Sequence, residues 1–172
     1  LTYAPGAGAA PRVGARIGDR VVDLQAAAKI ATRFAPATMK ALLQAGDMGM
    51  GSVRELVAAA AADAKRFGPA LHDERAIRYL PPVPDLDKFL CVGKNYRAHL
   101  EELKKNDLIK EMPGEVTGFV KLNSCLVGHD ARVVKPDVVE RLDYEPELVF
   151  VVGKRASRVK ADDEDALDFA MG

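Results

Sequence analysis

The chain has 172 residues, of which 48% are hydrophobic and 29% charged, a composition typical of a globular protein with an apolar core. Its 25 Lys and Arg balance its 25 Asp and Glu, which argues against nucleic acid as a partner, because phosphate binding needs a clustered basic excess. Apolar runs stay well below the roughly 18 residues of a membrane span, so no membrane partner is expected. Cys91 and Cys125 form neither a disulfide nor a zinc pattern, which favours a cytoplasmic location.

The sequence of residues 1–80 predicts a small α+β domain. Residues 11–17 and 20–24 are short runs rich in β-formers on either side of a Gly-Asp pair, a pattern typical of a β-hairpin. Two helices are expected to follow. Residues 38–46 begin with a capping threonine, and residues 52–67 begin with the capping-box pattern of Ser52-Val-Arg-Glu.

The run Pro81-Pro82-Val83-Pro84 marks the boundary with a second domain, residues 85–172, because it can continue neither a helix nor a central strand. Residues 89–92 are continuously apolar, as in a buried strand. A helix over residues 96–105, capped by Asn95, is expected next.

The sequence of the rest of this domain predicts mostly strands. They are expected at residues 119–121, 132–134 and 142–152, followed by a helix over residues 163–171 with an acidic start. Residues 106–118, between the helix at residues 96–105 and the first of these strands, carry proline and glycine and predict a mobile loop.

Glu145 and Glu147 lie two residues apart in the last predicted strand, so their side chains point to one face. Two carboxylates held this close repel each other unless a cation lies between them. A hard cation with oxygen ligands, such as Mg²⁺, Mn²⁺ or Ca²⁺, would remove this repulsion, with a further ligand from elsewhere. The alternative is a solvent-facing strand edge with two acidic residues.

His99 and Glu102 are three residues apart in the predicted helix and therefore share a face. Glu102 could orient the imidazole of His99 and leave its other nitrogen free to accept a proton. The alternative is an exposed histidine on a charged helix face. Lys121, at the end of a predicted strand, could bind an anionic substrate, or it could be a solvated strand end.

Three stretches, in this order, resemble the fumarylacetoacetate hydrolase family. Residues 89–102 look like the family's strand, Gly-x-Asn-Tyr turn and helix with a His…Glu pair. Residues 118–128 look like its Phe-x-Lys-Pro-x-Ser segment, with Leu122 in place of the usual proline. Residues 142–154 look like its metal-binding strand, and the unit that ends in Pro-Pro-Val-Pro is similar to the N-terminal domain of many members.

The resemblance implies an α+β fold, in which the small N-terminal domain precedes the first part of a mixed β-sandwich-roll domain with flanking helices. It also implies a homodimeric hydrolase that uses Mg²⁺ or Mn²⁺ to cleave a C–C bond in a 2-oxo acid of the acylpyruvate or fumarylacetoacetate type. Glu145 and Glu147 fall on two metal ligands, His99 on the general base, Glu102 on its partner, and Lys121 on a lysine near the pocket.

Two alternatives follow from the same resemblance. Relatives on this scaffold decarboxylate, hydrate or isomerise related 2-oxo acids, so each of these reactions is an alternative to hydrolysis. The family's third metal ligand is an aspartate that falls shortly beyond the position of Gly172, so the chain is expected to be incomplete at its C-terminus. The alternative of another class is therefore a truncated relative that binds a metal or a partner without turnover.

Overall fold

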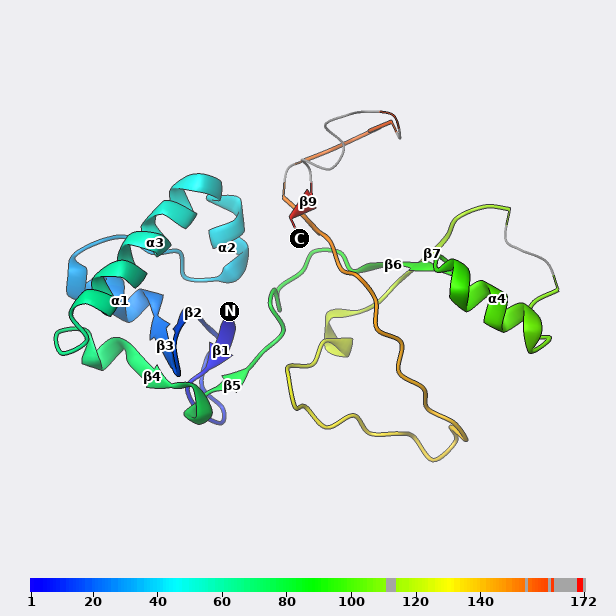
Figure 1. The fold of residues 1–172 in the computed structure, drawn as a ribbon, viewed down its shortest axis with the longest axis horizontal. Helices are drawn as coiled ribbons and strands as arrows, with labels where there is room; N and C mark the ends of the chain where they lie inside the picture. The colour runs from blue at the N-terminus through cyan, green and yellow to red at the C-terminus, as the bar shows by residue number, and fades with distance from the viewer. Residues whose placement is uncertain (111–113, 154, 161, 163–169, 172) are drawn as a thin grey trace.

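The computed structural model describes residues 1–110, 114–153, 155–160, 162 and 170–171. Figure 1 shows residues 1–80, called here the N-terminal unit, as a sheet with helices packed on it. The described residues that follow form an extended path that carries short strands and one further helix, α4 (Arg97–Lys105). Among the described residues, none of the helices combines the length and the apolar character that a membrane span requires.

The N-terminal unit is built on a five-stranded antiparallel sheet with the strand order β4-β3-β2-β1-β5. The strands are β1 (Thr2–Ala4), β2 (Arg12–Ile17), β3 (Arg20–Asp23), β4 (Leu71–Asp73) and β5 (Arg78–Tyr79). The predicted hairpin is confirmed: β2 and β3 pair with Ile17 opposite Arg20, and Gly18 takes the left-handed conformation in the turn.

Three helices belong to this unit: α1 (Leu24–Ala31), α2 (Met39–Gln44) and α3 (Gly46–Ala62). The expected cap of α2 is confirmed, because the Thr38 hydroxyl accepts a hydrogen bond from the Ala41 amide. The expected bounds of α3 were wrong at both ends. Its capping box is not used, since the Ser52 hydroxyl instead donates to the Phe34 carbonyl. Short 3₁₀ turns lie at Gly68–Ala70, Glu74–Ala76 and Asn123–Cys125.

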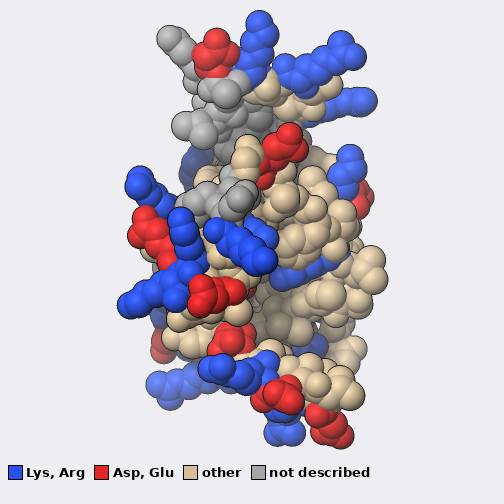
Figure 2. All heavy atoms as spheres, turned by 90° about the vertical axis from the view of Figure 1, so that its right-hand side faces the viewer, with Lys and Arg blue, Asp and Glu red and all other residues tan. Residues whose placement is uncertain are grey.

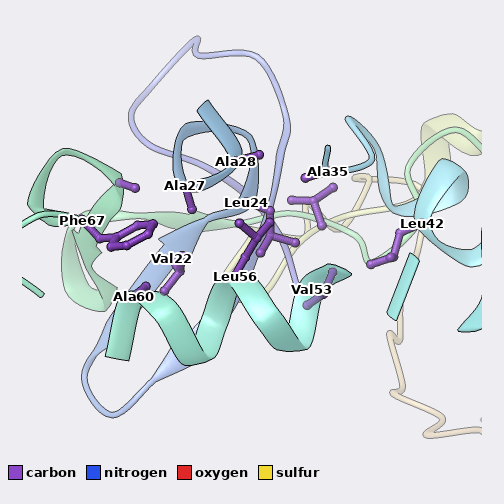
Figure 3. Packing of buried hydrophobic residues seen from close by; sticks show 12 residues of the cluster. Val22, Leu24, Ala27, Ala28, Ala35, Leu42, Val53, Leu56, Ala60 and Phe67 are labelled. Atoms are coloured by element: carbon purple, nitrogen blue, oxygen red, sulfur yellow. The ribbon is translucent and has the colours of Figure 1, made fainter. Parts of the chain in front are cut away.

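The core of the unit lies between α1, α3 and the sheet (Figure 3). Leu24 of α1, Leu56 of α3 and Val22 of β3 are at most 1% exposed and meet there. Phe67, just beyond α3, packs at one end of this cluster. Fully burying a Val, Leu or Phe side chain contributes about 1.5–3 kcal/mol, so the six Val and Leu residues of the cluster, together with Phe67, give this unit a stable core.

Asp23 joins the sheet to α1 through a buried network of hydrogen bonds. Its carboxylate is fully buried and caps α1 by accepting from the Ala26 amide at 2.8 Å. It also accepts from the Arg12 guanidinium at 2.6 Å and from the Tyr3 hydroxyl at 3.0 Å. Burial opposes ionisation, but these three hydrogen bonds outweigh it, so the pKa of Asp23 lies below its ordinary value.

The described residues after the proline-rich run pair only in short ladders. Strands β6 (Leu90–Gly93) and β7 (Thr117–Val120) are antiparallel, with Leu90 opposite Val120. Strands β8 (Val151–Val152) and β9 (Ala170–Met171) form a second pair. The strand and helix expected at residues 89–92 and 96–105 are confirmed as β6 and α4 to within about a residue. The expected burial of this strand was wrong except at Cys91, because Leu90 and Val92 are exposed.

Three expectations for this part need correction. Of the long strand expected over residues 142–152, only β8 forms, and residues 132–134 form no strand. The helix expected over residues 163–171 lies mainly outside the described residues, and its last two described residues form β9. Apolar alternation predicts which face of a strand is buried, but it does not identify the strand that pairs with it. Within the described chain, residues 142–150 pair with no other strand. The presence of helices and antiparallel sheets confirms the α+β class.

The Asp23 network predicts a large loss of stability in Asp23→Ala. The variant loses a helix cap and two hydrogen bonds to a charged group, so the free energy of unfolding should fall by about 3 kcal/mol in urea titrations at pH 7. The control Asp47→Ala removes an exposed carboxylate from α3. It should change the free energy of unfolding by no more than about 0.5 kcal/mol.

The same measurement has a defined pH dependence. Because the folded-state pKa of Asp23 is lowered, its ionic stabilisation is complete above the unfolded pKa of about 3.9 and is lost as the pH falls through the folded value. The difference in the free energy of unfolding between wild type and Asp23→Ala should therefore become smaller below about pH 4. A difference that stays constant to pH 2 would contradict this assignment.

Candidate active site

The first turn of helix α4 carries one buried side chain, Leu100. The helix follows β6 after a turn in which Lys94 adopts a positive φ of 54°. The Tyr96 carbonyl accepts a hydrogen bond from the Leu100 amide at 3.0 Å, and Leu100 is only 8% exposed. The expected cap by Asn95 was wrong, because Tyr96 is the N-cap and no side chain caps the helix. Leu100 therefore fixes one face of α4, and the adjacent face carries His99.

His99 lies between two carboxylates. Its Nδ1 is 3.9 Å from Glu102 Oε2, one turn along the same helix, and its Nε2 is 3.8 Å from Glu145 Oε1. Both distances exceed a hydrogen bond, although catalytic pairs without substrate are often this loose. The His99 side chain is 40% exposed, so a small molecule can reach it.

Glu145 and Glu147 lie in an extended segment without a strand partner among the described residues. Both are exposed. The segment touches α4 at a second point, where the Leu148 amide donates to the Tyr96 hydroxyl at 2.9 Å. Sequence reasoning missed this role of Tyr96, and no local signal could have revealed it, because the contact spans 52 residues.

Lys121 follows β7 directly. Its amide donates to the Phe89 carbonyl at 3.0 Å, and its ammonium lies 5.8 Å from the centre of the Phe119 ring. Within the described part of the chain, no ion pair joins Lys121 to Glu102 or Glu145, the two carboxylates beside His99. The structure thus brings His99, Glu102 and Glu145 together and leaves Lys121 apart from them.

The donor set around Glu145 suits a hard divalent cation in its chemistry. Two carboxylates on one short segment supply the oxygen ligands that Mg²⁺ and Mn²⁺ prefer. In the ranges that the structure describes, however, no group of three or more His, Cys, Asp or Glu side chains is placed to hold a metal.

The surface around α4 carries charges of both signs. Figure 2, which views the right-hand side of Figure 1, shows Lys and Arg interspersed with Asp and Glu around an uncharged area. On α4 itself, Arg97 pairs with Glu101 at 3.2 Å. Because Glu101 pairs with its own helix neighbour, it is a natural comparison for Glu102 beside His99.

Comparison with known proteins places these residues in a family. Residues 88–172 match the family model described as fumarylacetoacetate (FAA) hydrolase C-terminal. The chain is 31% identical to an oxaloacetate tautomerase of Bacillus subtilis, over 93% of this chain and 53% of that protein. It is 28% identical to a mitochondrial oxaloacetate tautomerase of Xenopus laevis, over 94% of this chain and 46% of that protein.

A mitochondrial oxaloacetate tautomerase of Rattus norvegicus is 31% identical, over 89% of this chain and 44% of that protein. The chain thus spans about half the length of the curated relatives that it matches. The family-model match covers α4 and the Glu145 segment, the parts that build the geometry described above. With the His99 motif and the Glu145 segment inside it, the matched region, residues 88–172, belongs to the fumarylacetoacetate hydrolase family.

Proposed function

We propose that this protein is a metal-dependent enzyme that interconverts the keto and enol forms of a 2-oxo dicarboxylic acid such as oxaloacetate. The observation that carries the proposal is the position of His99 between the carboxylates of Glu102 and Glu145. A tautomerase needs one group that removes a proton from carbon and returns it to oxygen, and His99 is a suitable group. The names of the related tautomerases support this substrate class.

In this mechanism His99 accepts a proton from the carbon next to the 2-oxo group. The adjacent carboxylate of Glu102 orients the ring and stabilises the imidazolium that forms. His99 then returns the proton to the enolate oxygen, which gives the enol, and the reverse sequence gives the keto form. Glu145 and Glu147 would hold Mg²⁺ or Mn²⁺, which when bound draws electron density from the 2-oxo group.

Hydrolytic C–C cleavage of an acylpyruvate is the second candidate. The observation that favours it is the partial exposure of His99, whose side chain is 40% exposed and can contact water. There His99 would activate the water that attacks the distal carbonyl. Product analysis separates the two functions, because a tautomerase leaves the carbon skeleton intact whereas a hydrolase releases pyruvate and a carboxylic acid.

His99→Ala should abolish most of the tautomerase activity. Loss of a general base typically costs about 10²- to 10⁴-fold in kcat. The measurement follows the ultraviolet absorbance of enol oxaloacetate with purified full-length protein and Mg²⁺. Wild-type turnover that survives unchanged in His99→Ala would refute the assigned role, and a wild type without turnover of any 2-oxo acid would favour a non-catalytic binding protein.

Glu102 and Glu101 provide a matched pair of substitutions on one helix. Glu102→Gln should lower kcat by about tenfold or more, because the imidazole loses the carboxylate that orients it. Glu101→Gln removes the same charge from a residue that pairs with Arg97 and should leave kcat nearly unchanged. Equal losses in both variants would indicate an effect of helix charge and would contradict a specific role for Glu102.

A further inference from the structure

We infer that Tyr96 is a positioning residue, whose hydroxyl holds the segment with Glu145 and Glu147 against α4. The inference rests on the proposed function, because it assigns Tyr96 a task at the same site. Its basis is the hydrogen bond from the Leu148 amide to the Tyr96 hydroxyl at 2.9 Å. This bond joins two segments that are 52 residues apart in the sequence.

The bond acts directly on the backbone beside Glu147. The Leu148 amide belongs to the peptide unit that begins at the Glu147 carbonyl, and peptide units are planar. Fixing this one amide therefore fixes the orientation of the backbone at Glu147. In an extended chain, side chains two residues apart point to the same face, so Glu145 and Glu147 share a face. Glu145 lies within 3.8 Å of His99 on this face.

Tyr96 is well placed for this task because its own backbone is fixed. Its carbonyl accepts from the Leu100 amide at 3.0 Å, and the buried Leu100 anchors the first turn of α4. His99 follows Tyr96 by three residues, and it lies in the first turn of α4, which Tyr96 precedes. The start of α4 thus supplies both the base and the contact that brings a carboxylate to it.

The other contact in this region is too weak to hold the segment alone. The His99–Glu145 pair is separated by 3.8 Å, and the Glu145 side chain is 71% exposed. Exposed pairs of this kind are screened by water and contribute little. Residues 142–150 have no strand partner among those that the structure describes. The bond from the Leu148 amide, although exposed, has hydrogen-bond length at 2.9 Å, whereas the His99–Glu145 distance does not.

Tyr96→Phe tests the inference, because it removes the hydroxyl and keeps the ring. The first readout is hydrogen exchange of the Leu148 amide in the full-length protein without metal. This amide should be protected in the wild type and should exchange about fivefold faster in the variant, as expected for loss of one hydrogen bond. The second readout is Mn²⁺ affinity by calorimetry, which should fall several-fold because Glu145 and Glu147 are less well placed.

Tyr144→Phe is the matched control. Tyr144 directly precedes Glu145 and is 91% exposed, so its loss of a hydroxyl should change neither readout. Tyr96 is 41% exposed, and circular dichroism should show that both variants fold. If Tyr96→Phe does not fold, the wild type alone tests the inference. Protection of its Leu148 amide from exchange supports the hydrogen bond to Tyr96, and an unprotected amide overturns the inference.

The remaining outcomes separate this inference from the proposed function. Unchanged exchange in Tyr96→Phe, or faster exchange with unchanged Mn²⁺ affinity, overturns the positioning role. If both readouts change as expected but the wild type turns over no 2-oxo acid, the positioning role stands and the proposed function fails. If the wild type is active, kcat in Tyr96→Phe should fall together with its Mn²⁺ affinity.

Discussion

The candidate site depends on one long-range contact, between the first turns of α4 and the segment around Glu145. Without this contact, His99 has a single carboxylate neighbour on its own helix, Glu102. With it, a second carboxylate from a distant segment lies 3.8 Å from the other imidazole nitrogen. Glu102 can then orient the imidazole for proton transfer at carbon, and Glu145, a candidate metal ligand, lies beside the other ring nitrogen.

The two parts of the chain are stabilised in different ways. The N-terminal unit has a closed apolar core around Leu56 and a buried carboxylate, Asp23, that is satisfied by three donors. The site lies instead among two-stranded ladders, which are marginal by themselves. Apolar side chains such as Phe119 and Leu148 are more than half exposed there. Within the described residues, the site is therefore held by a few specific contacts and not by a core.

Local sequence signals predicted the elements that depend on neighbours in the chain. The Gly18 turn, the Thr38 cap and the α4 helix follow from residues within one or two turns of each other. The start of α3 was missed because Ser52 and Glu55 match a capping box, whereas in the structure Ser52 lies inside the helix and its hydroxyl donates to the Phe34 carbonyl. Helix α1 was missed because Asp23, which caps this helix, is also the last residue of the preceding strand β3.

The candidate site, too, was predictable only where it depends on residues that are close in the sequence. The i,i+3 spacing placed His99 beside Glu102, and the spacing of Glu145 and Glu147 indicated paired carboxylates. Nothing local could show that Glu145 meets His99, because that pairing depends on how two distant segments pack. The division into domains 1–80 and 85–172 and the roles of the five site residues, Lys121 included, stay predictions.

The most direct measurement is calorimetry of full-length protein with oxalate, which mimics the enolate of a 2-oxo acid, in the presence and absence of Mn²⁺. The account predicts oxalate binding that requires Mn²⁺ and is lost in Glu145→Gln, whereas Glu140→Gln, an exposed glutamate upstream, binds like the wild type. No binding at millimolar metal, or equal binding by Glu145→Gln, would contradict a metal-dependent 2-oxo acid site beside His99.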